Sequence, residues 1–217
     1  MTRRYPEGFV VLLFRLVATD LRAKALYCYD SNSFGAMVKV LLTDGTAAMI
    51  YYRLMQWARR WRLMPLEMIF NKMNTVLCNC IIGRGAEFGP GFVLIHSTGV
   101  VINGMVRAGS NFFVYHQVTL GSTRQGVPVI GDDVFIGAGA KIIGPVTIGD
   151  GARIGANAVV LHDIPPHVTA VGIPARIVRD RAVDSSSAPS ESVPKGAESS
   201  NGKSNDKPDS IAEDQAL

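Results

Sequence analysis

The sequence has few cysteines, few charges and no long uninterrupted apolar run, and each shortage excludes a class of protein. Only three cysteines occur among 217 residues, too few for a disulfide framework. Cys78 and Cys80 are too close for an ordinary bridge and lack further ligands at metal spacing, so with Cys28 they are predicted to be reduced structural thiols, and no metal site is expected. The richest apolar stretches, 9–17 and 37–52, are interrupted by charges, so neither reaches the ~18 to 20 residues of a bilayer-spanning helix.

Charged residues make up 18% of the chain, with a net charge of +4. This modest excess suits an anionic ligand but does not indicate nucleic-acid binding, so no nucleic-acid partner is expected. Arg3 and Arg4 precede the first apolar stretch, yet no small-residue cleavage site follows. A secretory signal is therefore not indicated, and we expect a cytoplasmic protein.

A period of six runs from Ile82 to Val160. Thirteen of fourteen positions taken at every sixth residue are large and apolar: Ile82, Phe88, Leu94, Val100, Val106, Phe112, Val118, then Arg124 as the exception, and Ile130, Ile136, Ile142, Ile148, Ile154 and Val160. This period fits neither an α-helix nor an ordinary half-buried strand. It is typical of a hexapeptide β-helix, in which each six-residue rung puts one aliphatic side chain into the core.

A second position of the rung is also patterned. Small residues recur four places after the aliphatic one and are predicted to point inward at a corner: Ala86, Thr98, Gly104, Ser110, Ala140, Ala152 and Ala158. Phe92 and His116 break this rule. The twelve-residue spacing from Val118 to Ile130 predicts that one rung, 121–129, is replaced by a polar loop. A loop that projects from a regular solenoid is usually functional.

The segments on either side of the repeat differ from it in composition. Residues 1–78 predict an N-terminal helical region, in which apolar residues over 9–17 form one helical face. Possible N-caps at 30–33 precede a helix over 34–42, Gly45 marks a break before a helix over 46–63, and Pro65 opens a fourth helix that ends near Leu77. The β-helix domain is expected over 79–182. Residues 183–217 are rich in Ser, Pro, Glu and Lys without apolar periodicity, which predicts a disordered tail.

The third helical segment combines arginines with tryptophans: Arg53, Arg59, Arg60 and Arg62 beside Trp57 and Trp61. We interpret it as a solvated basic face whose tryptophans pack on the β-helix. Weak association with a membrane surface is the alternative.

Six short stretches match one family: 96–101, 118–121, 136–142, 154–156, 165–167 and 172–178. Through them the chain, from about Asp20 to Val178, resembles the serine O-acetyltransferases among the hexapeptide-repeat acyltransferases. The resemblance implies a mainly β protein, a left-handed parallel β-helix with an N-terminal helical region. It also implies a homotrimer that binds acetyl-CoA in the grooves between neighbouring β-helices.

The resemblance also assigns roles to residues. His96 matches the general base of the family, and Asp30 falls on an aspartate that contacts serine. The positions lining the CoA channel correspond to Gly121, Ser122, Ala138 and Ala156. Candidates for the CoA phosphates, chosen by charge, are Lys141, Arg153 and Arg176.

Three departures from the family fall at the site itself. Ile95 stands where the family has aspartate, Ile81 where it has the aspartate that orients the histidine, and Val127 where it has a second active-site histidine. The sequence therefore shows no carboxylate that would orient His96. A catalytic role and a buried, hydrogen-bonded role both stay open for His116, which strand spacing places within roughly 8 to 10 Å of His96.

The remaining histidines, His162 and His167, are expected to be structural. Together these features predict an acetyl-CoA-dependent O-acetyltransferase in which a neutral histidine takes the proton of an acceptor hydroxyl. The acceptor is L-serine, as in cysteine biosynthesis, or a saccharide such as an exopolysaccharide precursor. The alternative is a catalytically degenerate hexapeptide-repeat trimer that acts as an assembly scaffold.

Overall fold

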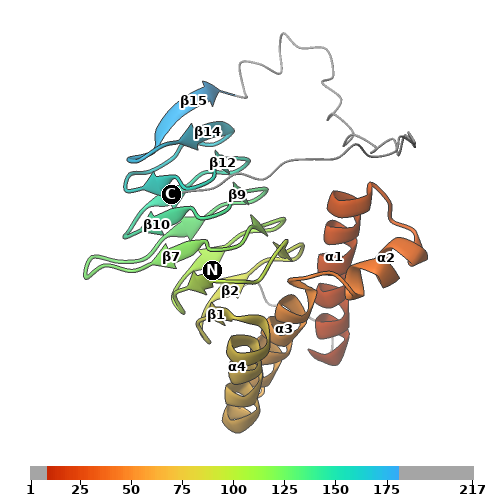
Figure 1. Ribbon diagram of the computed structural model, residues 1–217. Coiled ribbons are helices and arrows are strands. Elements are labelled where there is room, and N and C mark those ends of the chain that lie inside the picture. The colour runs from red at the N-terminus through yellow and green to blue at the C-terminus, as the bar shows by residue number, and fades with distance from the viewer. Residues whose placement is uncertain (1–8, 181–217) are drawn as a thin grey trace, which may run out of the picture. The chain divides into compact units, whose positions relative to one another are not determined.

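The computed structural model describes residues 9–180, in which four helices precede a solenoid of short strands (Figure 1). The helices are α1 (Phe9–Tyr29), α2 (Phe34–Leu41), α3 (Thr46–Arg60) and α4 (Met64–Cys78). Ser33 caps α2, because its Oγ accepts a hydrogen bond from the Ala36 N–H at 3.2 Å. The predicted tail, 183–217, lies outside the described residues, and the division into domains stays a prediction.

The strands form three sheets that are the sides of a parallel β-helix. One sheet has the order β1-β4-β7-β10-β13, the second β11-β8-β5-β2 and the third β15-β14-β12-β9-β6-β3. Every pairing is parallel except that of β14 with β15. The bounds are β1 (Cys80–Ile82), β2 (Glu87–Phe88), β3 (Val93–Leu94), β4 (Val100–Ile102), β5 (Arg107–Ala108), β6 (Phe113–Val114), β7 (Thr119–Gly121), β8 (Val129–Ile130), β9 (Phe135–Ile136), β10 (Lys141–Ile143), β11 (Thr147–Ile148), β12 (Arg153–Ile154), β13 (Val159–Val160), β14 (Val168–Val171) and β15 (Arg176–Asp180). The predicted β-helix with N-terminal helices is confirmed.

The register of the first coil corrects the strict period of six. Leu94 pairs with Val114 twenty residues later, although three rungs of six would give eighteen. The two extra residues lie in the turn between β3 and β4. Beyond that turn the positions in phase with Ile82 and Leu94 are therefore Ile102, Val114 and Leu120. The residues that the period selected there, Val100, Val106, Phe112 and Val118, are fully buried but occupy the second inward position of the rung.

The same shift corrects the predicted corner residues. Thr98, Gly104 and Ser110 were expected to point inward, but Thr98 is exposed and the other two are only partly buried. The loop prediction changes too, because the buried Ile130 comes ten positions after the buried Leu120, whereas an ordinary rung has a spacing of six. The rung is thus retained, and a loop over 122–128 lengthens it by four residues.

Buried polar contacts fix the helices to the first coil. The guanidinium of Arg53 donates to Asp20 at 2.7 Å and to the carbonyl oxygens of Phe88 and Gly89. Arg53 is only 1% exposed, so the expectation that it lies on a solvated face is wrong. Its guanidinium instead satisfies carbonyl groups at the turn after β2, where α1 and α3 meet the solenoid. Trp61, expected to pack on the β-helix, is half exposed.

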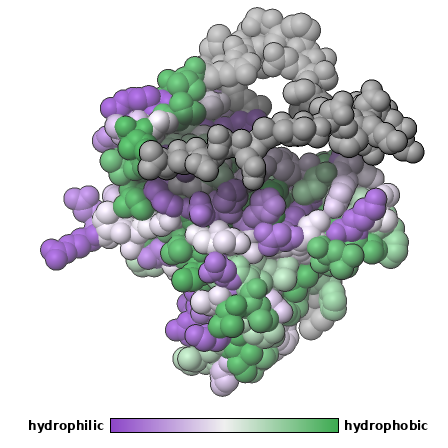
Figure 2. All heavy atoms as spheres, in the orientation of Figure 1, coloured by the Kyte–Doolittle hydropathy of each residue, from purple (hydrophilic) through white to green (hydrophobic). Residues whose placement is uncertain are grey.

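Two features of the helices concern the surface. Among the residues described, no single helix is long and apolar enough to cross a membrane; α2 and α3 pass such a test only as a pair, bent by 87° at their junction. Hydrophobic side chains gather over α4 in Figure 2. They include Met64, Met68, Ile69, Val76 and Leu77, each more than half exposed.

Candidate active site

His96 is paired with an aspartate that sequence reasoning missed. It lies in the lengthened turn between β3 and β4, while Asp44 lies in the turn between α2 and α3. His96 Nδ1 is 3.1 Å from Asp44 Oδ2, and Ser97 Oγ donates to Asp44 Oδ1 at 3.1 Å. A carboxylate only accepts hydrogen bonds, so we assign the ring proton to Nδ1, which leaves the Nε2 lone pair free. Both side chains are about half exposed, so the pair faces solvent.

Asp44 is held as a carboxylate by its neighbours. Partial burial raises the pKa of its carboxyl group, but hydrogen bonds from the Gly45 N–H, from Ser97 and from His96 outweigh that effect, and the net pKa is lowered. Because its pKa is lowered, the carboxyl group of Asp44 stays ionised through the ordinary pKa range of an aspartate and is protonated only in more acidic solution. Asp44 therefore carries a full negative charge beside His96 at neutral pH.

A glycine allows the Asp44 turn to approach the solenoid. Gly45 has φ +78°, a left-handed conformation, and a Cβ there would lie 2.3 Å from the carbonyl oxygen of Leu94. No side chain fits that gap, and the obstacle is backbone that cannot rotate away. Gly45 thus lets the start of α3 lie directly against the end of β3, two residues before His96.

Replacing Gly45 with alanine should therefore separate Asp44 from His96. We expect the free energy of unfolding to fall by about 2 to 3 kcal/mol, from left-handed strain and the backbone clash. The measurement is thermal or urea unfolding. Gly35→Ala in α2 is the matched control: a Cβ there has nothing within 4 Å, so a neutral or slightly stabilising change is expected. Equal stability of the two variants would contradict the close approach.

His96 and His116 occupy equivalent positions in successive coils. Each comes two residues after a paired strand residue, Leu94 or Val114, and their ring centroids are 5.7 Å apart. This separation is inside the predicted limit of roughly 8 to 10 Å, because the twenty-residue coil brings the two turns into register. His116 Nδ1 is buried and has no hydrogen-bond partner among the described residues, so the alternative of a buried, hydrogen-bonded histidine gains no support.

Two small predicted residues continue this row. Ala138 follows β9 and Ala156 follows β12, again two residues after paired strand residues. His96, His116, Ala138 and Ala156 therefore line one edge of the β-helix, where the six-stranded sheet turns into the five-stranded one. Lys141 is close to this edge, since its Nζ donates to the Gln117 carbonyl.

The other predicted residues lie apart from that edge. Gly121 ends β7 and Ser122 begins the long loop, on the opposite side of the five-stranded sheet, where Ser122 Oγ accepts from Asn103 Nδ2 at 3.0 Å. On the six-stranded sheet, the Arg153 guanidinium lies 5.0 Å from the centroid of the Phe135 ring, and Arg176 is exposed on β15. Asp30 is exposed just beyond α1.

Aromatic side chains surround the histidine pair. The Tyr115 ring centroid is 6.4 Å from that of His96 and 5.4 Å from that of Phe135. Tyr27, from α1, brings its hydroxyl to within 2.9 Å of the Tyr115 hydroxyl. The end of α1 thus contributes to the same surface as the histidines.

The three departures noted in the sequence now have structural settings. Ile81 is 48% exposed on the outer face of β1, Ile95 is buried, and Val127 packs partly against the core. The orienting carboxylate comes from Asp44 instead, 52 residues before His96. The signal available in the sequence was the Asp44-Gly45 pair immediately before a helix, but nothing local linked it to His96.

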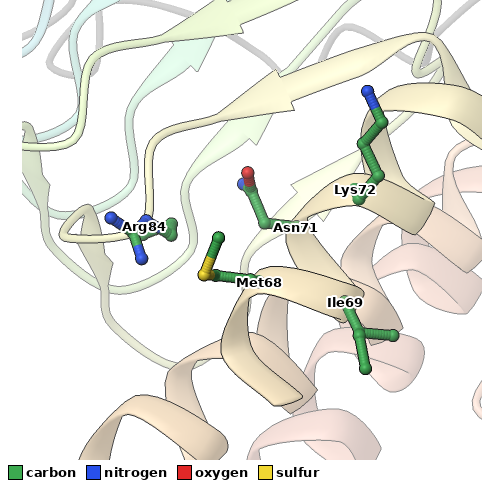
Figure 3. A pocket seen from close by; sticks show the side chains of 5 residues that line it. All are labelled: Met68, Ile69, Asn71, Lys72 and Arg84. Atoms are coloured by element: carbon green, nitrogen blue, oxygen red, sulfur yellow. The ribbon is translucent and has the colours of Figure 1, made fainter. Parts of the chain in front are cut away.

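An open pocket occurs elsewhere, on α4. The helix lines it with Met68, Ile69, Asn71 and Lys72, and the turn after β1 contributes Arg84 (Figure 3). None of the predicted site residues lies in it.

Comparisons with known proteins relate the chain to hexapeptide-repeat transferases. Residues 128–162 match the family model described as bacterial transferase hexapeptide (six repeats). A serine acetyltransferase of Helicobacter pylori (strain J99) is 38% identical over 147 residues, which are 65% of this chain and 86% of that protein.

Solved structures are similar over most of the described region. Neisseria gonorrhoeae serine acetyltransferase in complex with serine superposes with a TM-score of 0.69 at 33% identity, covering 76% of this chain and 69% of that one. A serine acetyltransferase in complex with CoA gives a TM-score of 0.67 at 28% identity, covering 78% and 74%. The similarity includes both the helices and the solenoid, since it spans three quarters of the chain.

Proposed function

The chain belongs to the serine acetyltransferase family of acyltransferases, and from that premise we propose that it transfers the acetyl group of acetyl-CoA to the hydroxyl of L-serine. The observation that carries the proposal is the contact of His96 with Asp44, which leaves a ring nitrogen free to act as a base. Relatives solved with serine and with CoA support the identity of acceptor and donor.

The chemistry needs one base and one acyl donor. Nε2 of His96 removes the proton of the acceptor hydroxyl while that oxygen attacks the thioester carbonyl carbon. A carbon–oxygen bond forms, and the tetrahedral intermediate then collapses with loss of the carbon–sulfur bond. The proton on His96 passes to the departing CoA thiolate, which restores the neutral imidazole. Asp44 stabilises the imidazolium in between, because its negative charge lies 3.1 Å from Nδ1.

Small side chains support a donor site along the histidine edge. Ala138 and Ala156 leave the backbone accessible to the amide groups of a pantetheine arm in line with His96. Lys141, Arg153 and Arg176 are the proposed phosphate contacts, and Lys141 bonds the carbonyl of Gln117, next to His116. Gly121 and Ser122 lie across the five-stranded sheet from it. A donor site that uses both sets therefore requires a second copy of the chain.

We expect the protein to be a trimer with three such shared grooves. Light scattering should give a mass near that of three 23.4 kDa chains, about 70 kDa. Ser122→Trp should block acetyl-CoA binding without changing this mass, because the loop of one copy would line the groove of its neighbour. A monomer at micromolar concentration with full activity would contradict the shared site.

A saccharide hydroxyl is the second candidate acceptor, and the aromatic surface favours it. Tyr115 is adjacent to His96, and the Tyr27 and Tyr115 hydroxyls meet at an exposed position. Sugar rings commonly stack on such rings through their apolar C–H faces, while hydroxyl groups bind to phenolic oxygens. Asp30, which the family resemblance assigns to serine, follows Tyr27 by three residues, just beyond the end of α1.

The deciding experiment offers both acceptor classes to one preparation. Purified protein is mixed with acetyl-CoA and a thiol reagent that reports free CoA, and serine or a panel of saccharides is then added. Serine-dependent release supports the proposal, and release only with a saccharide selects the second candidate. Absence of release with every acceptor, despite acetyl-CoA binding, would favour a scaffold. We place the reaction in the cytoplasm, where acetyl-CoA is made; the three free cysteines suit a reducing compartment.

A further inference from the structure

A buried lysine connects the two segments that carry the histidine and its partner. Lys24, in α1, is only 1% exposed. Its Nζ donates to the carbonyl oxygen of Asp44, to Thr46 Oγ1 at 3.1 Å and to the carbonyl oxygen of Leu94 at 2.9 Å. An ammonium group has three N–H donors, so this set uses all of them.

These acceptors flank the proposed base. One is the main chain of Asp44, whose side chain contacts His96, and another is Leu94, two residues before His96. Without a donor between them, two carbonyl oxygens would face the same buried space at a position where Gly45 already brings the backbones into contact. Unpaired buried carbonyl groups are costly, and their mutual repulsion would push the turn and the strand apart.

The surroundings of Lys24 also indicate a specific role. Burial lowers its pKa to about 8, and the smaller effects of Cys28 and Asp44, which favour the charged form, only partly offset this. The group still carries a proton at neutral pH. A methionine would fill the same space without this desolvation cost, so packing alone does not explain a lysine here.

We propose that Lys24 is a positioning residue for catalysis, which holds the Asp44 turn against the end of β3 and so fixes the orientation of His96. This inference rests on the proposed function, in which His96 is the base. Lys24 acts through Asp44 and touches neither substrate, and the family resemblance assigned nothing to its position.

The first test is Lys24→Met in the full-length protein, with Tyr52→Phe as the matched control. Tyr52 is also fully buried and also bonds a helix to the first coil, through Ala86 and Phe88, but it does not contact the Asp44 turn. We expect Lys24→Met to lower kcat by about 10- to 100-fold with little change in the KM for acetyl-CoA, since small misplacements of a base have effects of this size. Tyr52→Phe should lower only the unfolding temperature.

The second readout does not depend on activity. Nitrogen-15 NMR of the histidine rings should show the proton of His96 on Nδ1 in the wild type and in Tyr52→Phe, and a mixture of tautomers in Lys24→Met. If Lys24→Met does not fold, Lys24→Arg serves instead, because it keeps the charge but replaces the compact ammonium with a planar fork. A wild-type tautomer and wild-type kcat in the folded variant would overturn the proposal.

A double-mutant cycle separates positioning from general stabilisation. If Lys24 acts through Asp44, adding Lys24→Met to Asp44→Asn should lower kcat by no more than about 3-fold beyond the single Asp44 change. Full additivity of the two effects would overturn the inference. If the proposed function is wrong, His96→Ala keeps its turnover. The NMR comparison of the wild type with Lys24→Met still shows in that case whether Lys24 positions the His96 ring.

Discussion

Replacing His96 with alanine should lower the rate of acetyl transfer by about 10² to 10⁴-fold, the usual contribution of a positioned general base. Binding of acetyl-CoA should be nearly unchanged, because the donor contacts proposed above come from other residues. The decrease is therefore expected in kcat rather than in the KM for acetyl-CoA. Steady-state kinetics and calorimetric titration with CoA measure the two quantities.

Two further histidine variants show whether this effect is specific. His162→Ala changes an exposed residue beyond β13 and should leave turnover at the wild-type level. His116→Ala tests the second ring, 5.7 Å from the first. If it reduces kcat as much as His96→Ala without loss of stability, the two histidines work as a pair. Near-normal turnover of His96→Ala on the true acceptor would show that the base has been wrongly assigned.

Replacing Asp44 with asparagine should lower kcat by about 10² to 10³-fold. The amide has the same shape as the carboxylate but can donate a hydrogen bond to Nδ1, which would move the ring proton to Nε2 and block the base; an aspartate-to-asparagine change at a Ser-His-Asp triad acts in this way. The variant would also lose the negative charge that stabilises the imidazolium. Turnover and the NMR tautomer of His96 should change together.

An exposed ion pair elsewhere supplies the control for this change. Glu87 lies 3.2 Å from Arg107 on the four-stranded sheet, and both side chains are about half exposed or more. Surface pairs of this kind contribute little to stability, so Glu87→Gln should leave both kcat and folding unchanged. If Asp44→Asn were equally silent, the contact between Asp44 and His96 would have no part in the reaction.

The period of six was sufficient to predict the solenoid because it arises from local geometry. Each rung must bury one aliphatic side chain, so a large apolar residue recurs at about every sixth position. The second, third and fourth helices were predicted to within about three residues for a similar reason, since the signals at Ser33, Gly45 and Pro65 are local. Register was harder to predict, because two added residues in one turn shift the phase of the repeat. The pattern of apolar residues shows no interruption there, since each rung has a second inward position and Val100 and Phe112 fill it.

The candidate site could be predicted only in part. His96 lies within a recognisable stretch, but the contact with Asp44 depends on how α3 docks against β3, and docking is a tertiary property with no sequence period. The same holds for Lys24, which reaches an acceptor 70 residues away. Ile81, in place of the aspartate that orients the histidine in the family, indicated that another group must orient His96, but the sequence did not show which one.

The proposed base and its partner belong to different architectural parts of the chain. His96 lies in the solenoid, which also contains the proposed donor edge. Asp44 and Lys24 belong to the helical segment that precedes it. A solenoid expressed alone, from about residue 79, would keep the proposed donor edge. It would lose Asp44, and with it the contact that holds the ring proton of His96 on Nδ1. Under the proposed function, exchange of the helical segment would change the groups that orient His96 and leave the proposed donor edge unchanged. Chimaeras between relatives could exploit that boundary to retune reactivity without rebuilding the repeat.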